Sequence, residues 1–356
     1  MTRSRQLFSC AAAAVLVLAA SPAALAQHRD DWCPEPEARQ FDFWLGEWDV
    51  QNHNRPPNGD RWFETGRATD RVYTVLGGCA VVEHWRGYAF PQAGHIVGFS
   101  VRAWNPAAES WEAALLWPIG PNASFGTPSG GADGDDLVLR NQFEGSDGST
   151  VLSRLLFTDI DDDAFTWMNG ISHDGGDTWQ ASWRMDFTRR PATAAGLWNG
   201  PSMSTERCPQ PAYRTFDRYL GEWTGTRIAP GNDSTDVRTW LVRILEGCAV
   251  MVRTWTEDGS WERFAVRAYD ANLDRWVEYS LASDARALRR SEWDPHSGER
   301  AFAEVEPVDG VYTRVRWTSD DGGLQRIVEE APAADGPWTQ AYELRFTQRV
   351  AARQGP

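Results

Sequence analysis

The sequence predicts an all-β protein built from two tandem copies of one antiparallel unit. Four motifs occur twice in the same order, short stretches alternate between apolar and polar residues, and turn signals such as NGD, SDG and EDG recur at short intervals. No long stretch has the apolar period of an amphipathic helix. Units of roughly 150 residues with many short strands are typical of a β-sandwich or a closed β-barrel.

Residues 1–26 are expected to be a signal peptide that is removed from the mature protein. Arg3 and Arg5 precede the apolar run AAAAVLVLAA, and the stretch SPAALA ends at Ala26 in the manner of a cleavage site. The apolar run is too short to span a bilayer as a permanent anchor. We therefore expect a periplasmic or secreted protein that is not inserted in the membrane after cleavage.

The charge balance argues against several classes of partner and chemistry. The chain has 50 acidic and 35 basic residues and a net charge of −15, which argues against nucleic acid and anionic membranes as partners. All 35 basic residues are arginine. A lysine Schiff base, a pyridoxal phosphate anchor and a P-loop lysine are therefore excluded.

An internal repeat organises the rest of the chain. CPEPEARQFDFWLGEW, from Cys33, aligns without a gap with CPQPAYRTFDRYLGEW, from Cys208. GGCAVVEHW, VRAWNPAAESW and WQASWRMDFTRR then match EGCAVMVRTW, VRAYDANLDRW and WTQAYELRFTQR. The first copy spans residues 33–190 and the second 208–349, and the Pro-, Gly- and Ser-containing segment 191–207 is expected to link them.

The repeat also predicts the disulfides. An exported protein with an even number of cysteines favours disulfides, and the four cysteines of the mature chain allow three pairings. Both copies carry cysteines at matching positions, so each copy is expected to close its own bridge. The predicted pairs are Cys33–Cys79 and Cys208–Cys248.

Alternation places two polar residues on predicted inner faces of the first copy. In HIVGFSVRAW, His95 shares a face with Val97 and Phe99, which we interpret as the interior of the unit. In CAVVEHW, Glu83 shares a face with Cys79, Val81 and Trp85 in the same way. The second copy has Ser260 and Val252 at the positions of His95 and Glu83.

The motif GEW resembles the G-x-W motif of lipocalins. It occurs early in each copy, at Gly46–Trp48 and Gly221–Trp223. In that family the Trp closes the barrel floor and an Arg near the last strand stacks on it. The candidates for this Arg are Arg189 or Arg190 in the first copy and Arg349 in the second. The longer pattern FDFWLGEWDV…GGCAVVEHWRG…SHDGGDTW…DFTRR resembles a family of exported bacterial calycin-like proteins of mostly unknown function. The resemblance implies two tandem antiparallel lipocalin-like β-barrels.

Two further motifs suggest enzymes or metals but favour turns. SHDGGDTW, residues 172–179, is one complete Asp-box, whereas a sialidase propeller repeats the box about once per blade. DIDDDAFTW carries Asp159, Asp161 and Asp163 at calcium-loop spacing, but Ala164 replaces the loop glycine and no Glu completes the loop. We interpret the first as a β-turn and the second as an acidic connection between strands, with a weak calcium site as its alternative.

The candidate ligand-binding residues are polar or aromatic side chains that the second copy lacks or does not match. Glu83 either meets a ligand or is a salt-bridged core carboxylate, and His95 either meets a ligand or is hydrogen-bonded structure. Trp62, Trp117 and Trp167 have no secure partner in the repeat and are free for ligand contact; Trp293 of the second copy shares this property. The pairs at matched positions are interpreted as scaffold: Trp48/Trp223, Trp111/Trp276 and Trp179/Trp338.

These residues predict an exported binding protein that holds a small, mostly apolar or aromatic ligand in the first barrel, with a degenerate or structural second barrel. No cofactor or metal is required by this hypothesis; haem held by His95, as the calycin resemblance implies, is the one cofactor considered. The alternatives are a hydrolase or isomerase that acts on a glycan or lipid with Glu83 and His95 as acid and base, and a purely structural envelope module.

Overall fold

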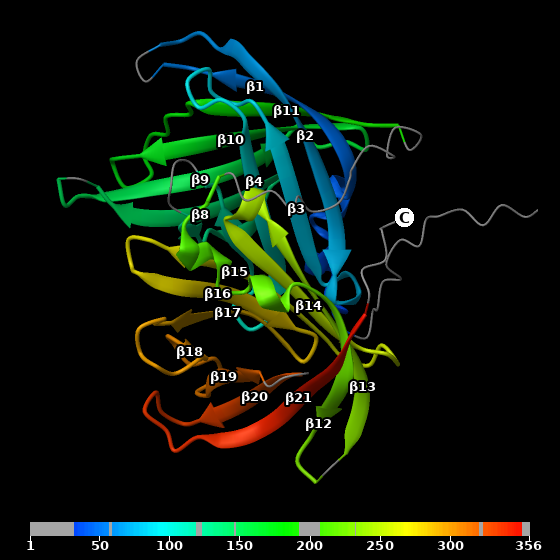
Figure 1. Cartoon of the computed structure of the whole chain (residues 1–356). Helices are drawn as coiled ribbons and strands as arrows, with labels where there is room; N and C mark the ends of the chain where they lie inside the picture. The colour runs from blue at the N-terminus through cyan, green and yellow to red at the C-terminus, as the bar shows by residue number, and fades with distance from the viewer. Residues whose placement is uncertain are drawn as a thin grey trace, which may run out of the picture.

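The chain forms two closed antiparallel β-barrels, one from each copy of the repeat, and so confirms the predicted all-β fold (Figure 1). The computed structural model describes residues 32–56, 59–118, 123–145, 147–191, 207–231, 233–319 and 323–350. The predicted signal peptide and residues 192–206 of the predicted linker lie outside the described residues.

Barrel one begins with the short 3-10 helices η1 (Pro36–Arg39) and η2 (Asp42–Trp44), and a third, η3 (Leu76–Gly78), precedes its third strand. Ten strands close the ring in the order β1-β2-β3-β4-β5-β7-β8-β9-β10-β11, and the two-residue strand β6 pairs with β5. The strands are β1 (Gly46–Asn54), β2 (Phe63–Val75), β3 (Ala80–Gly87), β4 (Ile96–Asn105), β5 (Ser110–Leu116), β6 (Phe125–Gly126), β7 (Ser129–Asp133), β8 (Asp136–Glu144), β9 (Thr150–Thr158), β10 (Ala164–Ser172) and β11 (Trp183–Arg189).

Barrel two repeats this plan. The helices η5 (Pro211–Arg214) and η6 (Asp217–Tyr219) precede its strands, and η7 (Leu245–Gly247) corresponds to η3. Its ten strands pair in sequence order and the last pairs with the first, which leaves no free sheet edge. They are β12 (Gly221–Ile228), β13 (Ser234–Ile244), β14 (Ala249–Thr256), β15 (Glu262–Asp270), β16 (Arg275–Ala282), β17 (Ala285–Trp293), β18 (Ala301–Glu304), β19 (Tyr312–Ser319), β20 (Leu324–Ala331) and β21 (Thr339–Val350).

The Trp of the GEW motif lies against an Arg of the last strand in each barrel. In barrel one the Arg189 guanidinium lies 4.1 Å from the centre of the Trp48 ring and donates hydrogen bonds to the carbonyls of Phe43 and Leu45 at 2.7 and 2.6 Å. Gly46 has φ +123°, and a Cβ there would lie 2.9 Å from the Arg189 guanidinium, so the motif needs glycine at this position. In barrel two Arg349 lies 5.7 Å from the ring centre of Trp223.

Each barrel contains its own disulfide, Cys33–Cys79 in barrel one and Cys208–Cys248 in barrel two, as the repeat predicts. Each bridge fastens the segment before the first strand to the start of the third strand. Disulfides persist in oxidising compartments, so the pair indicates an environment outside the cytoplasm. Within the described part of the chain, no helix combines the length and the apolar character needed to cross a membrane.

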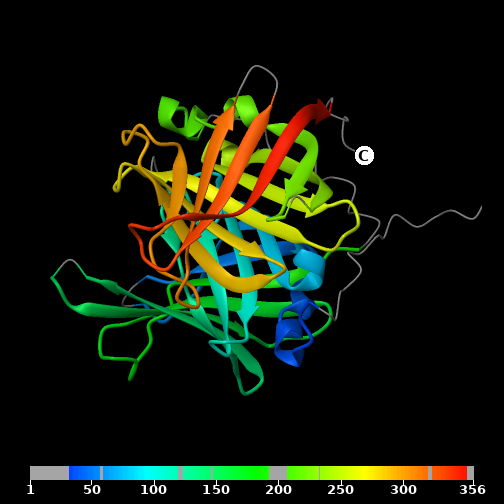
Figure 2. The same ribbon diagram turned by 90° about the horizontal axis from the view of Figure 1, so that it is seen from below.

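The two barrels pack side by side through apolar outer faces (Figure 2). Phe99 and Val101 of β4 belong to the same buried apolar cluster as Met251, Phe264 and Val266 of β14 and β15. Polar contacts surround this cluster. The described ones include the Arg286–Glu35 ion pair, the Leu288 N–H bound to Glu112 at 2.8 Å and the Ser124 hydroxyl bound to Asp270 at 2.7 Å.

The prediction that His95, Val97 and Phe99 face the interior of barrel one is wrong. Ser100, the neighbour of Phe99, donates its hydroxyl to Glu83 inside the barrel, and successive side chains of a strand point to opposite faces. Every residue of β4 is buried, because barrel two covers its outer face. Alternation therefore separates the two faces of β4, but hydrophobicity does not show which face points inward.

Candidate ligand site

Barrel one contains a cavity of about 310 Å³ that is open to solvent and has tryptophan walls. Trp44 comes from η2, while Trp117, Trp167 and Trp183 come from the barrel wall and its loops. Glu83, Arg102 and Arg154 are the charged residues of the lining. The other lining residues are Leu115, Ser124, Gly126, Pro128, Asn141, Ser153, Leu155, Asn169, Gly170, Ile171 and Met185.

The wall tryptophans are held edge to face. The Trp183 ring centre lies 5.4 Å from that of Trp117 and 5.1 Å from that of Trp167, with interplanar angles of 80° and 74°. The Trp183 indole N–H also donates to Asn52 at 2.9 Å. Gly98 gives Trp117 its space, because a Cβ at this position would lie 2.5 Å from the Trp117 ring. These contacts fix an aromatic surface before any ligand enters.

A buried ion pair lies at the inner end of the cavity. Glu83 of β3 and Arg102 of β4 are 3% and 2% exposed, and their side chains meet at 3.3 Å. The Ser100 hydroxyl donates to the same Glu83 oxygen, and the Arg102 guanidinium lies 4.2 Å from the ring centre of Trp44. Nε and Nη1 of Arg102 have no hydrogen-bond partner, so two donors are left at this end.

Asp70 of β2 lies near this pair and is itself fully buried. Burial, and next the nearby Glu83 carboxylate, raise the pKa of Asp70 well above its usual range, while Arg102 offsets part of the effect. The Trp44 indole and the Arg71 backbone act in the opposite direction, but more weakly. The raised pKa favours the protonated acid, which leaves the Glu83–Arg102 pair without net charge.

The structure brings together only part of the residues that the sequence singled out. Glu83, Trp117 and Trp167 line the cavity. Trp62 lies outside it, with its ring centre 4.9 Å from the Arg55 guanidinium. His95 lies between the barrels: its Nδ1 is 3.4 Å from Glu246 and its carbonyl accepts a 2.6 Å bond from Arg207.

This placement separates the two residues of the hypothesised acid/base pair. Glu83 points into barrel one and His95 faces η7 of barrel two, so no common substrate position joins them. Burial lowers the pKa of His95, which favours the neutral ring. Trp293 belongs to the core of barrel two.

Sequence reasoning missed Arg102 and Trp183. Arg102 follows Val101 in the repeated VRA motif and lies on the face of β4 opposite to the one taken as interior. Trp183 begins β11, and the second copy has Tyr342 at its place. An arginine inside a repeated apolar strand is the signal that could have found the ion pair.

The Asp-box and the acidic connection are turns, as predicted. Between β10 and β11, Asp174 accepts from the Thr178 hydroxyl at 2.5 Å, from the Thr178 N–H at 2.9 Å and from the Ser172 hydroxyl at 2.7 Å, and these bonds, the first most of all, lower its pKa to about 2. Between β9 and β10, Asp161 accepts from the N–H of Asp163 and Ala164 at 2.8 and 2.7 Å. Among the described residues, no group of three or more His, Cys, Asp or Glu is arranged to hold a metal ion.

Barrel two keeps the buried arginine but takes its partner from another strand. Arg267 stands where barrel one has Arg102, and it pairs with Glu278 of β16. Barrel one has Ala113 at the place of Glu278, and barrel two has Val252 at the place of Glu83. A paired arginine is therefore common to both barrels, and the difference at Glu83 is not by itself a sign of ligand binding.

The aromatic walls do differ between the barrels. The repeat matches Trp117 with Ala282 and Trp183 with Tyr342. Strand register matches Trp167 with Arg326, because these residues pair with Met185 and Leu344, which are equivalent in the repeat. At these three positions the tryptophans of barrel one are therefore not repeated, whereas barrel two places Trp293 and Trp317 elsewhere on its wall, around a pocket of about 270 Å³.

No protein-family model and no curated protein matches this chain. Solved structures with weak similarity include a protein of unknown function from the DUF3598 family of Nostoc punctiforme, at 12% identity and a TM-score of 0.25 over 89% of this chain and 100% of that one. A candidate AttH from Nitrosomonas europaea has 9% identity and a TM-score of 0.13 over 85% and 92%. The COG4313 outer membrane channel of Pseudomonas putida has 6% identity and a TM-score of 0.14 over 85% and 94%. TM-scores this low carry no argument about function.

Proposed function

We propose that the protein is an exported binding protein that holds a small, mostly apolar or aromatic ligand in barrel one. The observation that carries this proposal is the cavity of about 310 Å³ whose walls are formed by Trp117, Trp167 and Trp183. Ligand pockets of this kind are concave and mostly apolar, with a few placed polar groups. The resemblance to exported calycin-like proteins and the predicted signal peptide support the same proposal.

The cavity favours a ligand with a flat apolar body and one hydrogen-bond acceptor. An aromatic ring can pack against the fixed indole faces, and each Å² of apolar surface removed from water contributes about 25 cal/mol. Arg102 lines the inner end, so we expect a carbonyl or ether oxygen of the ligand to face its guanidinium there. The Glu83–Arg102 pair is already neutral, so the site does not call for a charged ligand.

The test uses the neutral aromatic probe N-phenyl-1-naphthylamine and the full-length mature protein. Trp167→Ala should weaken probe binding more than tenfold, equivalent to about 1.4 kcal/mol. Trp62→Ala is the matched control, because Trp62 lies outside the cavity, and it should bind the probe like the parent. Fluorescence titration measures both.

Absence of probe binding to the parent, or equal binding by the Trp167 and Trp62 variants, would contradict the proposal. The first result would favour a structural envelope module. If the probe binds as expected, mass spectrometry of the protein purified from its native host identifies the class of ligand that it carries.

A further inference from the structure

The interior of barrel two contains more buried arginines than carboxylates. Arg263 and Arg267 alternate along β15 with Phe264 and Val266, which face barrel one, so both arginines point inward. Arg326 of β20 pairs across the sheet with Leu344, a residue of the core of barrel two. The three guanidinium groups therefore enter the barrel from two separate parts of the wall.

Two of these three groups share one counter-charge. Glu278 pairs with Arg263 at 2.6 Å and also with Arg267. Arg326 is 3% exposed, and no carboxylate of the described residues lies within ion-pair distance of it. Its neighbours include the Thr254 hydroxyl at 3.5 Å and the face of Phe346 at 5.4 Å.

Several donors of this cluster are unsatisfied. Nε and Nη2 of Arg326 and Nε and Nη1 of Arg267 are buried without a hydrogen-bond partner. Burial, and next the repulsion from Arg267 and Arg263, lower the pKa of Arg326 to about 9, so the guanidinium stays charged at neutral pH. Glu304 pairs with Arg289 at 2.7 Å and also acts on Arg263, so its charge is shared between these two arginines.

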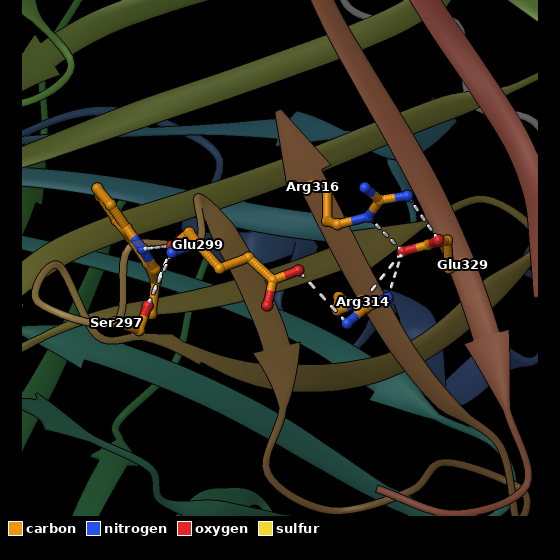
Figure 3. Close-up of polar contacts among 6 residues, drawn as sticks. Ser297, Glu299, Arg314, Arg316 and Glu329 are labelled. Carbon is orange, nitrogen blue, oxygen red and sulfur yellow. Dashed lines mark hydrogen bonds and ion pairs between the residues drawn. The ribbon is translucent and has the colours of Figure 1, made fainter. Parts of the chain in front are cut away.

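Two arginines on the outer face of β19, by contrast, are paired. Arg314 and Arg316 of β19 share Glu329 at 2.9 and 2.7 Å, and Arg314 also lies 3.4 Å from Glu299 (Figure 3). Leaving a buried charge without a partner is costly, whereas an exposed charge is solvated by water. Folding alone therefore favours paired arginines inside the barrel and unpaired ones outside, whereas in barrel two the unpaired Arg326 is inside.

We propose that barrel two binds a small anion with a carboxylate or phosphate head group, held by Arg326 and Arg267 with Arg263. The planar guanidinium fork matches the oxygens of both head groups and forms charge-assisted hydrogen bonds with them. Arg326, the cation without a carboxylate partner, stands where barrel one has Trp167. The two barrels therefore take ligands of different chemistry. This proposal does not depend on the function proposed for barrel one.

The test is isothermal titration calorimetry of the full-length mature protein with inorganic phosphate and, separately, with sodium octanoate. Binding of phosphate alone assigns a phosphate group, binding of octanoate alone assigns a carboxylate on an apolar chain, and 1-octanol is the uncharged control. Arg326→Gln should weaken anion binding more than tenfold. Arg316→Gln, which removes an exposed paired arginine, should leave it unchanged.

Two further readouts separate binding from folding. Without anion, Arg326→Gln should melt at or above the temperature of the parent, because it removes an uncompensated buried cation. Glu278→Gln removes the competing carboxylate and should strengthen anion binding several-fold. N-phenyl-1-naphthylamine binding in barrel one should be the same in the parent and in Arg326→Gln.

The proposal is overturned if neither phosphate nor octanoate binds the parent, or if Arg326→Gln binds them as tightly as the parent does. Should Arg326→Gln fail to fold, Arg326→Trp, which installs the residue of barrel one, takes its place. Failure of both variants to fold would show that Arg326 stabilises the empty barrel, and this result also refutes the proposal.

Discussion

Removing the Glu83 carboxylate should destabilise barrel one because it leaves Arg102 buried without a counter-charge. Both side chains are at most 3% exposed, so water cannot solvate the remaining cation. Breaking a buried pair by removing one partner typically costs about 3–5 kcal/mol, whereas replacing both partners with apolar groups is often neutral. Glu83→Gln should therefore lower the free energy of unfolding by about that amount, while Glu83→Gln/Arg102→Met should recover most of the loss.

The assay is urea denaturation of the full-length mature protein, followed by tryptophan fluorescence. The control is Asp133→Asn, which breaks the Arg140–Asp133 pair of the same barrel; both side chains there are more than half exposed, at 53% and 60%. Surface pairs contribute about 0–1 kcal/mol. If Glu83→Gln costs no more than Asp133→Asn, another group, such as an ionised Asp70, compensates Arg102 and the reasoning fails.

Further predictions concern the tryptophans of the GEW motifs, the disulfides and the dependence of stability on pH. Trp48→Ala should cost about 3–5 kcal/mol because Trp48 is fully buried, and Trp223→Ala should cost less because Trp223 is only partly buried; chemical denaturation compares them, and equal losses would contradict this. Replacing Cys33 and Cys79 by Ser should cost about 4 kcal/mol by the chain-entropy model for a separation of 46 residues, and a Cys33-to-Cys208 peptide in non-reducing mapping would refute the pairing. The pKa of Asp70 is raised in the folded state, so protonated Asp70 stabilises the fold fully below about pH 4. This stabilisation is lost as the pH rises towards the pKa that Asp70 has in the folded protein. Asp70→Asn should thus match the parent in acid and exceed its stability at pH 7; an unchanged difference between these conditions would refute the raised pKa.

The sequence was sufficient to predict the two-barrel plan because the relevant signals are local or repeated. The GEW motif, the matching cysteines and the terminal arginines each occur twice, so each copy supports the interpretation of the other. The stacking of Arg189 on Trp48 could be predicted for the same reason.

The site was only partly predictable because its missing parts depend on tertiary contacts. The outer face of β4 is apolar since barrel two covers it, and no local pattern distinguishes that face from a barrel interior. The partner of Arg267 lies on a different strand from the partner of Arg102, and alignment of the copies does not reveal this exchange. Trp62 lacks a partner in the repeat, yet it lies outside the cavity, because absence from the second copy says nothing about orientation.

Part of the contact between the barrels uses equivalent parts of both copies, and a further part joins β17 of barrel two to β4 and β5. The η3 turn of barrel one lies against β15, and the η7 turn of barrel two lies against β4, which are matching elements of the repeat. Such reciprocal contacts are the property of an isologous dimer with two-fold symmetry. A single-barrel protein with the same apolar face is expected to associate with a second copy of itself, and the tandem chain keeps the two halves at a high effective concentration at any dilution. Once the halves are covalently joined, their interiors are free to diverge. In this chain, barrel one has tryptophans at three wall positions where barrel two has none, and barrel two has the buried arginine cluster.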